Sequence, residues 1–127
     1  MKPQTFSLHP GEWAILKLPP DAPVPDWTRL PAPFLSITRT ADELSIVAPA
    51  SRIPAGIPAE RGWTLLQLKG PFAFDQTGIL ASIATPLAEA GVGIFALSTF
   101  DTDYLLVKTS QIPLALSALH AAGHTQA

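Results

Sequence analysis

The sequence contains no cysteine, and that absence removes several kinds of site at once. A disulfide framework, a thiolate metal site and a cysteine nucleophile are all excluded, and the absence fits a reducing cytoplasm. No stretch approaches the ~18 consecutive apolar residues of a membrane-spanning helix. Residues 1–11 also lack the apolar core of a signal peptide. We therefore expect a soluble, cytoplasmic protein that does not contact a membrane.

Charged residues are scarce, at 14% of the chain, and eight Lys and Arg against ten Asp and Glu give a formal net charge of -2. Binding to a phosphate backbone depends mainly on clustered cations, so we expect no nucleic-acid partner. Hydrophobic residues make up 47% of the chain, which is ample for a packed interior. The 127 residues suffice for one compact unit, or for two small units that share a core.

Recognisable catalytic patterns are missing too. No Gly-x-Ser-x-Gly elbow and no glycine-rich phosphate loop occurs, and the chain has no asparagine to orient a water as in acylphosphatase-type sites. The imidazoles are those of His9, His120 and His124. The last two have helical spacing, but Gly123 interrupts the helix and no nearby acid completes a set of metal ligands, so we expect surface histidines there. We expect no enzyme, no metal and no cofactor.

The chain carries a weak internal repeat. Residues 13–18 align with 63–68, and both stretches are typical of strands. Residues 34–47 align with 94–107, and each of these blocks predicts a β-hairpin. The connection between the blocks is longer in the second copy (69–93) than in the first (19–33), so the second copy has room for a helix that the first lacks.

Composition supports that difference between the copies. Residues 19–33 contain six prolines, which predict a loop with at most one helical turn near residues 26–30. Residues 78–90 instead predict an amphipathic helix, with one apolar face formed by Ile79, Leu80, Ile83 and Leu87. Asp75 or Thr77 is a candidate cap, and Gly91 a stop. Pro86 lies inside this helix and predicts a kink or a break, at a cost of roughly 3 kcal/mol, with nothing in the sequence to compensate.

A further helix is expected after the second hairpin, where apolar residues from Ile112 to Leu119 recur at helical spacing. Residues 50–60 of the first copy contain two prolines and a glycine and predict little more than a turn. The second copy therefore reads β-α-β-β-α, one strand short of the βαββαβ ferredoxin-like unit of the α+β class. We expect residues 5–8, or a strand of the first copy, to cover the open sheet edge. The predicted units are 1–61, degenerate with a loop in place of its long helix, and 62–127.

Three stretches of the second copy resemble an ACT domain: Asp75-Gln76-Thr77-Gly78-Ile79-Leu80, Leu87-Ala88-Glu89-Ala90-Gly91-Val92 and Leu97-Ser98-Thr99-Phe100-Asp101-Thr102-Asp103. The match spans about residues 62–122. The last stretch is similar to the subgroup that contains aspartate-kinase regulatory domains and the cytosolic arginine sensor. Residues 36–38 and 43–47 resemble the partner unit of that tandem arrangement more weakly.

The resemblance implies that a free amino acid binds between two ACT units and that the outcome is regulatory. It assigns the ligand's ammonium group to Asp103 and its carboxylate to backbone N–H groups where the long helix begins, a position that attracts anions. Asp103 matches an acidic position of the arginine sensor, whereas Gln76 stands where that sensor is acidic. A neutral amide binds a guanidinium less strongly, so charge alone does not select arginine. The implied ligand-binding set is Asp75, Gln76, Thr77, Gly78, Ile79, Thr99, Phe100 and Asp103, with Ser45 and Ile46 from the first copy.

Each of these residues also has a simpler structural explanation. Asp75 or Thr77 is equally explained as a helix cap, and Asp101 and Asp103 as solvated turn residues. Phe100 is unusual at a hairpin tip and indicates a pocket wall or a protein interface. Trp13 and Trp63 occupy matched strand positions and are expected in the core.

Two functions of different class therefore remain. One is an amino-acid sensor that regulates a protein partner, and the other is a structural or oligomerisation module that has lost its ligand. A homo-oligomer is expected in either case.

Overall fold

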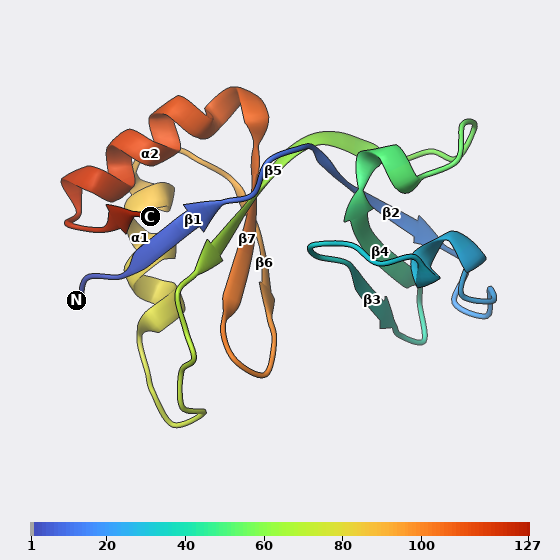
Figure 1. Cartoon of the computed structure of the whole chain (residues 1–127), viewed down its shortest axis with the longest axis horizontal. Helices are drawn as coiled ribbons and strands as arrows, with labels where there is room; N and C mark the ends of the chain where they lie inside the picture. The colour runs from blue at the N-terminus through green and yellow to red at the C-terminus, as the bar shows by residue number, and fades with distance from the viewer. Residues whose placement is uncertain (1) are drawn as a thin grey trace. The chain divides into compact units, whose positions relative to one another are not determined.

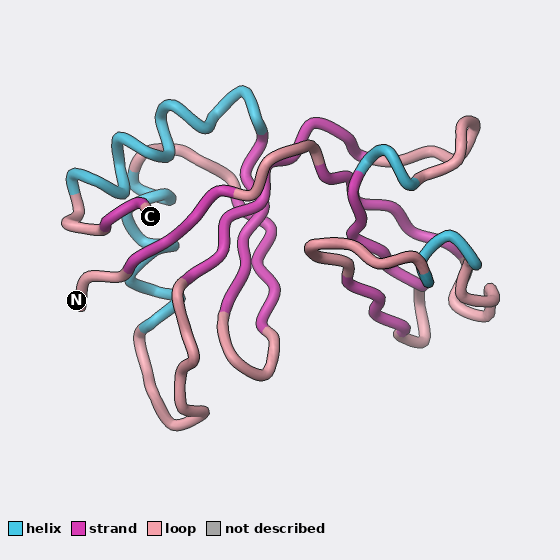
Figure 2. Tube along the Cα trace, in the orientation of Figure 1, coloured by secondary structure: helices cyan, strands magenta, loops and turns pink. Residues whose placement is uncertain are grey.

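The computed structural model describes residues 2–127 and divides into two compact units. One unit is residues 11–62, and the other combines residues 2–10 with 63–127. The division after Gly62 lies next to the predicted boundary, but the first residues of the chain belong to the second unit. Figure 1 traces both units, and Figure 2 shows that helices are concentrated in the second.

The second unit, named the 63–127 unit below although it includes residues 2–10, has an α+β, ferredoxin-like fold in which a layer of helices packs on a sheet. Its elements are β1 (Thr5–Leu8), β5 (Glu60–Leu68), α1 (Ile79–Glu89), β6 (Ile94–Ser98), β7 (Asp103–Lys108), α2 (Ile112–Ala121) and β8 (Thr125–Gln126). The strand order within the unit is β6-β7-β5-β1-β8. Both helices cover the same face of this sheet (Figure 1). Both predicted helices and the predicted hairpin of this copy are confirmed.

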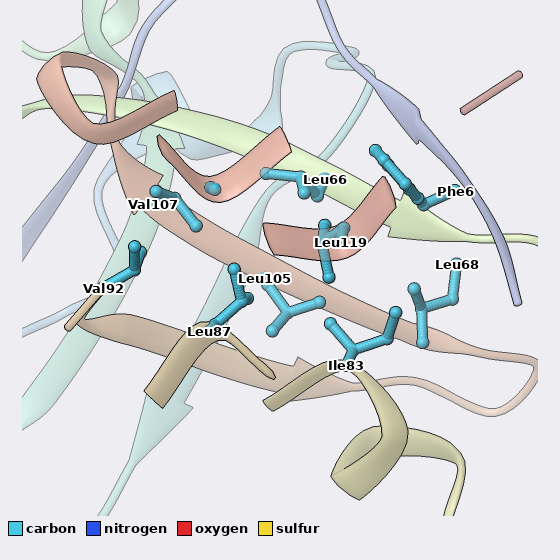
Figure 3. Packing of buried hydrophobic residues seen from close by; sticks show 10 residues of the cluster. Phe6, Leu66, Leu68, Ile83, Leu87, Val92, Leu105, Val107 and Leu119 are labelled. Carbon is cyan, nitrogen blue, oxygen red and sulfur yellow. The ribbon is translucent and has the colours of Figure 1, made fainter. Parts of the chain in front are cut away.

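The core of this unit forms where alternate strand residues meet the apolar faces of the helices (Figure 3). The strands contribute Leu66, Leu68, Leu105, Val107 and Phe6; the helices contribute Ile83, Leu87, Ala115 and Leu119. All of these side chains are buried. Since each large apolar side chain stabilises the fold by about 1.5–3 kcal/mol when buried, this cluster holds the helices on the sheet.

The edge that the repeat left open is covered by the start of the chain. β1 pairs antiparallel with β5, with Phe6 opposite Leu68, and β8 pairs parallel with β1, with Thr5 opposite Thr125. The first of the two predicted covers for this edge is therefore confirmed. β1 thus occupies the strand position that the second copy lacked, and the two-residue β8 lies outside it at the edge of the sheet.

The 11–62 unit is an antiparallel three-stranded sheet without a long helix. β3 (Ser36–Arg39) and β4 (Leu44–Pro49) form the predicted hairpin, and β4 also pairs with β2 (Trp13–Leu18). Within residues 11–62, all of which are described, the helical segments are the short 3-10 turns η1 (Asp26–Arg29) and η2 (Ala50–Arg52). This agrees with the expected loss of the long helix in the first copy.

Two arginines hold the proline-rich loop in this unit. The Arg39 guanidinium donates hydrogen bonds to the carbonyls of Pro20 and Ala22, the latter at 2.8 Å. The Arg52 guanidinium donates to the carbonyls of Leu30, at 3.0 Å, and Pro31. Because proline has no N–H to donate, the loop cannot build a regular backbone ladder, and the arginines supply donors to its carbonyls.

Helix α1 does not break at Pro86, and His124 explains why. Proline removes the N–H that would bond to the Ser82 carbonyl one turn earlier. The His124 Nε2 lies 2.8 Å from that carbonyl oxygen, while its Nδ1 accepts the Gln4 backbone N–H at 2.9 Å. These partners require the neutral tautomer with the proton on Nε2. The prediction of a surface histidine at 124 is wrong, because this side chain is only 5% exposed and replaces the bond that Pro86 cannot make.

We predict that His124→Ala lowers the free energy of unfolding by about 3 kcal/mol, since it leaves one buried donor and one buried acceptor without partners. In a Pro86→Ala background the loss should be smaller by about 1 kcal/mol, because the alanine introduced there has an N–H to donate to the Ser82 carbonyl. A double-mutant cycle from urea unfolding measures this coupling. Equal losses in both backgrounds would contradict the role assigned to His124.

Candidate functional site

A cavity of about 350 Å³ lies in the 63–127 unit, between the β6–β7 hairpin tip and the start of α1. Its walls come from three segments that are separate in sequence: the loop after β5, the first turn of α1 and the hairpin tip. The lining residues are Phe72, Ala73, Phe74, Gln76, Gly78, Ile79, Leu80, Ala81, Ser98, Thr99, Phe100, Asp101, Thr102 and Asp103. The structure therefore brings together Gln76, Gly78, Ile79, Thr99, Phe100 and Asp103 of the predicted set.

Asp103 opens β7 and lies opposite Ser98 at the end of β6. The Ser98 hydroxyl donates to Asp103 Oδ1 at 2.6 Å, which orients the carboxylate. Asp103 is half-buried and lines the cavity. Together with Asp101 it gives the cavity wall two carboxylates, whereas the lining contains no Lys, Arg or His. The electrostatics of the wall therefore favour a cationic group.

The hairpin tip places an aromatic residue in the wall of the cavity. A turn is closed by the Thr99 N–H, which donates to the Thr102 carbonyl at 2.8 Å. Phe100, within this turn, meets Phe74 of the opposite loop edge to face, with ring centroids 4.9 Å apart. Both phenylalanine residues are 78% exposed, so this pair is an apolar patch that the fold itself does not bury.

The start of α1 contributes backbone donors. Gly78 is the N-cap residue, with a φ of 79° in the left-handed region, and no side chain caps the helix. The prediction that Asp75 or Thr77 caps this helix is therefore wrong. The first intrahelical bond is from the Ser82 N–H to the Gly78 carbonyl, at 3.0 Å. Three residues that line the cavity, Ile79, Leu80 and Ala81, consequently have N–H groups without an acceptor inside the helix.

Gln76 shapes the loop that leads into α1. Its side-chain Oε1 accepts the Ala73 N–H at 2.6 Å, and its own N–H donates to the Ala73 carbonyl at 3.1 Å. Thr77 lines a separate hollow of about 250 Å³ with Lys2 and Gln4. Asp75 is exposed in the same loop and is not part of the wall of the larger cavity.

The two residues predicted from the first copy lie on β4 of the 11–62 unit. Ser45 is paired between Lys17 of β2 and Thr38 of β3. The Ile46 side chain is fully buried in the core of that unit. Their assignment as ligand contacts stays a prediction.

Sequence reasoning missed the residues that hold the hairpin tip in place. The Thr102 hydroxyl donates to the Leu68 carbonyl at 2.7 Å, and the Phe72 N–H donates to the Asp101 carbonyl at 2.8 Å. Phe74, Leu80 and Ala81 were also missed as cavity walls. The one sequence signal for Phe74 was the polar run that follows it directly, Asp75-Gln76-Thr77.

Within residues 2–127, no group of three or more His, Asp and Glu side chains is arranged to hold a metal ion. Over the same residues, no helix combines the length and apolar character needed to span a membrane.

We predict that Thr102→Val lowers the free energy of unfolding by about 1–2 kcal/mol, since the isosteric change leaves the buried Leu68 carbonyl without its donor. Thr102→Ser keeps the hydroxyl and should lose clearly less. Urea unfolding of the two variants measures the difference. If valine is as stable as serine at this position, the hydrogen bond does not hold the tip.

Comparison with known proteins identifies relatives of both units. Residues 59–121 match the family model described as the ACT domain, and residues 11–56 match a model described as an N-terminal domain. A crystal structure of an Agobacterium tumefaciens protein is 39% identical, has a TM-score of 0.93 and aligns over 100% of this chain and 94% of its own.

Two further relatives carry functional names. The cytosolic arginine sensor for mTORC1 subunit 1 from Mus musculus is 35% identical over 66 residues, which are 51% of this chain and 20% of the sensor. This chain therefore matches about a fifth of the length of that relative. Aspartate kinase from Clostridium acetobutylicum aligns with a TM-score of 0.63 and 14% identity, over 92% of this chain and 33% of the kinase. At that identity the likeness shows a shared fold alone.

Proposed function

Because this chain belongs to the ACT domain family, we propose that it is an amino-acid-binding regulatory module whose ligand occupies the cavity of the 63–127 unit. One observation carries the proposal. A single cavity joins the carboxylate of Asp103 to the first N–H groups of α1, so groups of opposite polarity face the same space. A zwitterion needs both.

The carboxylate of the amino acid binds at the start of α1. The N–H groups of Ile79, Leu80 and Ala81 have no acceptor within the helix, and the helix dipole adds an attraction of about 0.3–1 kcal/mol for an anion. Gly78, which has no side chain, leaves room for the ligand at the N-cap.

The ammonium group binds at Asp103. Oδ1 already accepts the Ser98 hydroxyl, so Oδ2 is the oxygen that takes the ligand's N–H. A charge-assisted bond of this kind is roughly twice as strong as a neutral one. Thr99 and the phenyl rings of Phe74 and Phe100 then surround the ligand side chain. The resemblance also predicts contacts from Ser45 and Ile46 of the first unit.

The ligand acts as a regulator because it joins two elements. The hairpin tip and the start of α1 belong to the same unit but are far apart in sequence, and a bound zwitterion favours conformations in which they approach. A protein partner that recognises those conformations would respond to amino-acid concentration. The cytosolic location named for the arginine sensor supports a cytoplasmic location for this chain.

We predict that at least one common amino acid raises the melting temperature of the protein. At about 100 times its dissociation constant it should add about 2.7 kcal/mol to the free energy of unfolding. Asp103→Asn should abolish this stabilisation but leave the unliganded free energy of unfolding within about 0.5 kcal/mol, because Asn still accepts the Ser98 hydroxyl. Thermal melts against each amino acid give both numbers.

Asp42→Asn is the matched control, since Asp42 is an exposed turn residue of the 11–62 unit and its substitution makes the same change in charge. It should leave ligand stabilisation intact. If no amino acid shifts the melt of the wild-type protein, the ligand-binding function is wrong and the oligomerisation function is favoured.

One observation supports the oligomerisation function. It also supports a homo-oligomer if the protein binds an amino acid. Among the described strands, β6 pairs with β7 alone, and it carries neither charge nor proline, the usual protections of an edge strand. In an antiparallel pair, every second residue bonds to the partner strand, and the Thr99 N–H bonds to the Thr102 carbonyl. The backbone N–H and C=O groups of Ile94, Ala96 and Ser98 therefore point away from β7, toward the free edge. Two copies of β6 that pair antiparallel about Ala96 would bond all three, with Phe95 of each copy opposite Leu97 of the other.

We predict that Ala96→Lys weakens self-association by at least tenfold, because two lysines would face each other across the centre of this pairing. Thr38→Lys adds the same charge to exposed β3 and should leave association unchanged. Sedimentation equilibrium measures the dissociation constants. A protein that is monomeric at every concentration tested would exclude the homo-oligomer.

A further inference from the structure

We infer that Gly70 is a positioning residue for the proposed ligand site, because its lack of a side chain sets where the hairpin tip lies. The part of this inference that concerns ligand affinity rests on the proposed function, whereas the part that concerns the position of the tip does not. Gly70 lines no part of the cavity that contains Asp103. It lies in the segment between β5 and α1 that the tip packs against.

The tip is held by hydrogen bonds to residues on both sides of Gly70, at the end of β5 and in the segment after it. Before Gly70, the Leu68 carbonyl accepts the Thr102 hydroxyl at 2.7 Å. After it, the Phe72 N–H donates to the Asp101 carbonyl at 2.8 Å. Thr99, Phe100 and Asp101 are themselves exposed, so these two bonds are the main restraints on the tip beyond its own turn.

Gly70 sits directly between these two bonds and against the tip. A Cβ at this position would lie 2.8 Å from the Asp101 carbonyl oxygen and 3.0 Å from the Thr102 Cβ. Neither contact is with the end of a flexible side chain that could move aside. Any residue larger than glycine must therefore displace the backbone of the tip or the segment that holds it.

The glycines of this chain differ in why they lack a side chain. Gly56, Gly62, Gly78, Gly91 and Gly123 have positive φ values and open space where a Cβ would be, so conformation accounts for them. Gly70 is not among the residues with positive φ, and it is crowded. Lack of space, and not a positive φ, is what requires glycine at this position.

Displacement of the tip changes the ligand site because the tip carries it. Asp103 follows Thr102 directly, and Thr99 and Phe100 belong to the same turn. Binding groups need to be held within about 0.5 Å of their productive positions, and a displaced tip would move these three residues together. Gly70 thus controls ligand affinity without touching the ligand.

The test compares Gly70→Ala with Gly93→Ala, since Gly93 has nothing within 4 Å of its Cβ position and no positive φ. Two readouts are used. The first, without ligand, is the nuclear Overhauser contact between the rings of Phe74 and Phe100, which reports the position of the tip. The second is the calorimetric affinity for whichever amino acid stabilises the wild-type protein.

We expect Gly70→Ala to lose the contact between the two rings and to bind the amino acid at least tenfold more weakly. Gly93→Ala should keep the ring contact and the wild-type affinity. Leu119→Val, which destabilises the core at α2 and leaves α1 and the β6–β7 hairpin unchanged, should lower the melting temperature without loss of affinity and so separates positioning from stability. Should Gly70→Ala fail to fold, Thr102→Val removes one of the two bonds without adding volume and should weaken the ring contact and the affinity.

An intact ring contact in Gly70→Ala overturns the inference whether or not a ligand is found. Wild-type affinity in Gly70→Ala, combined with loss of binding in Asp103→Asn, overturns the inference and leaves the proposed function standing. If no amino acid binds the wild-type protein, the proposed function is wrong, and so is the claim that Gly70 controls affinity. The ring contact still tests whether Gly70 sets the position of the tip.

Discussion

The packing of α1 on the sheet is the constraint on which the site depends. Ile83 and Leu87 are fully buried against the strands, and they fix the helix along its length. The direction of the helix then determines where its first N–H groups lie, and the β6–β7 ladder determines where Asp103 lies. Neither element forms a site alone. The cavity exists because the same core that stabilises the unit holds the helix start beside the hairpin tip.

The same core shows how the fold tolerates a proline that should break its main helix. His124 donates to the Ser82 carbonyl and accepts from the Gln4 N–H, so one buried imidazole links α1, the N-terminal segment and the end of the chain. The N-terminal strand is thereby part of the ACT unit in spite of its place in the sequence. Through this imidazole, and through the pairing of β8 with β1, both ends of the chain contact the unit that contains α1.

Hydrophobic periodicity and proline content were sufficient to predict the helices, both hairpins and the missing helix of the first copy. These features depend on local sequence and on burial of one face. The cap of α1 and the roles of His124 and Gly70 were not predictable, because each depends on atoms that are distant in sequence. Gln76 illustrates the difference: its place in the loop was clear from the sequence, but its bond to Ala73 was not. For the candidate site, the resemblance predicted a set of positions, and the fold adds Phe74, Leu80 and Ala81 as residues that line the same cavity.

The most direct test of the central claim is a ¹H–¹⁵N correlation spectrum of the full chain recorded as amino acids are added. The account predicts that one class of amino acid shifts the amide signals of Ile79, Leu80 and Ala81 together with that of Asp103, with a common dissociation constant. Amide signals at the helix start and at the hairpin that respond with different dissociation constants, or that respond to no amino acid, would contradict it.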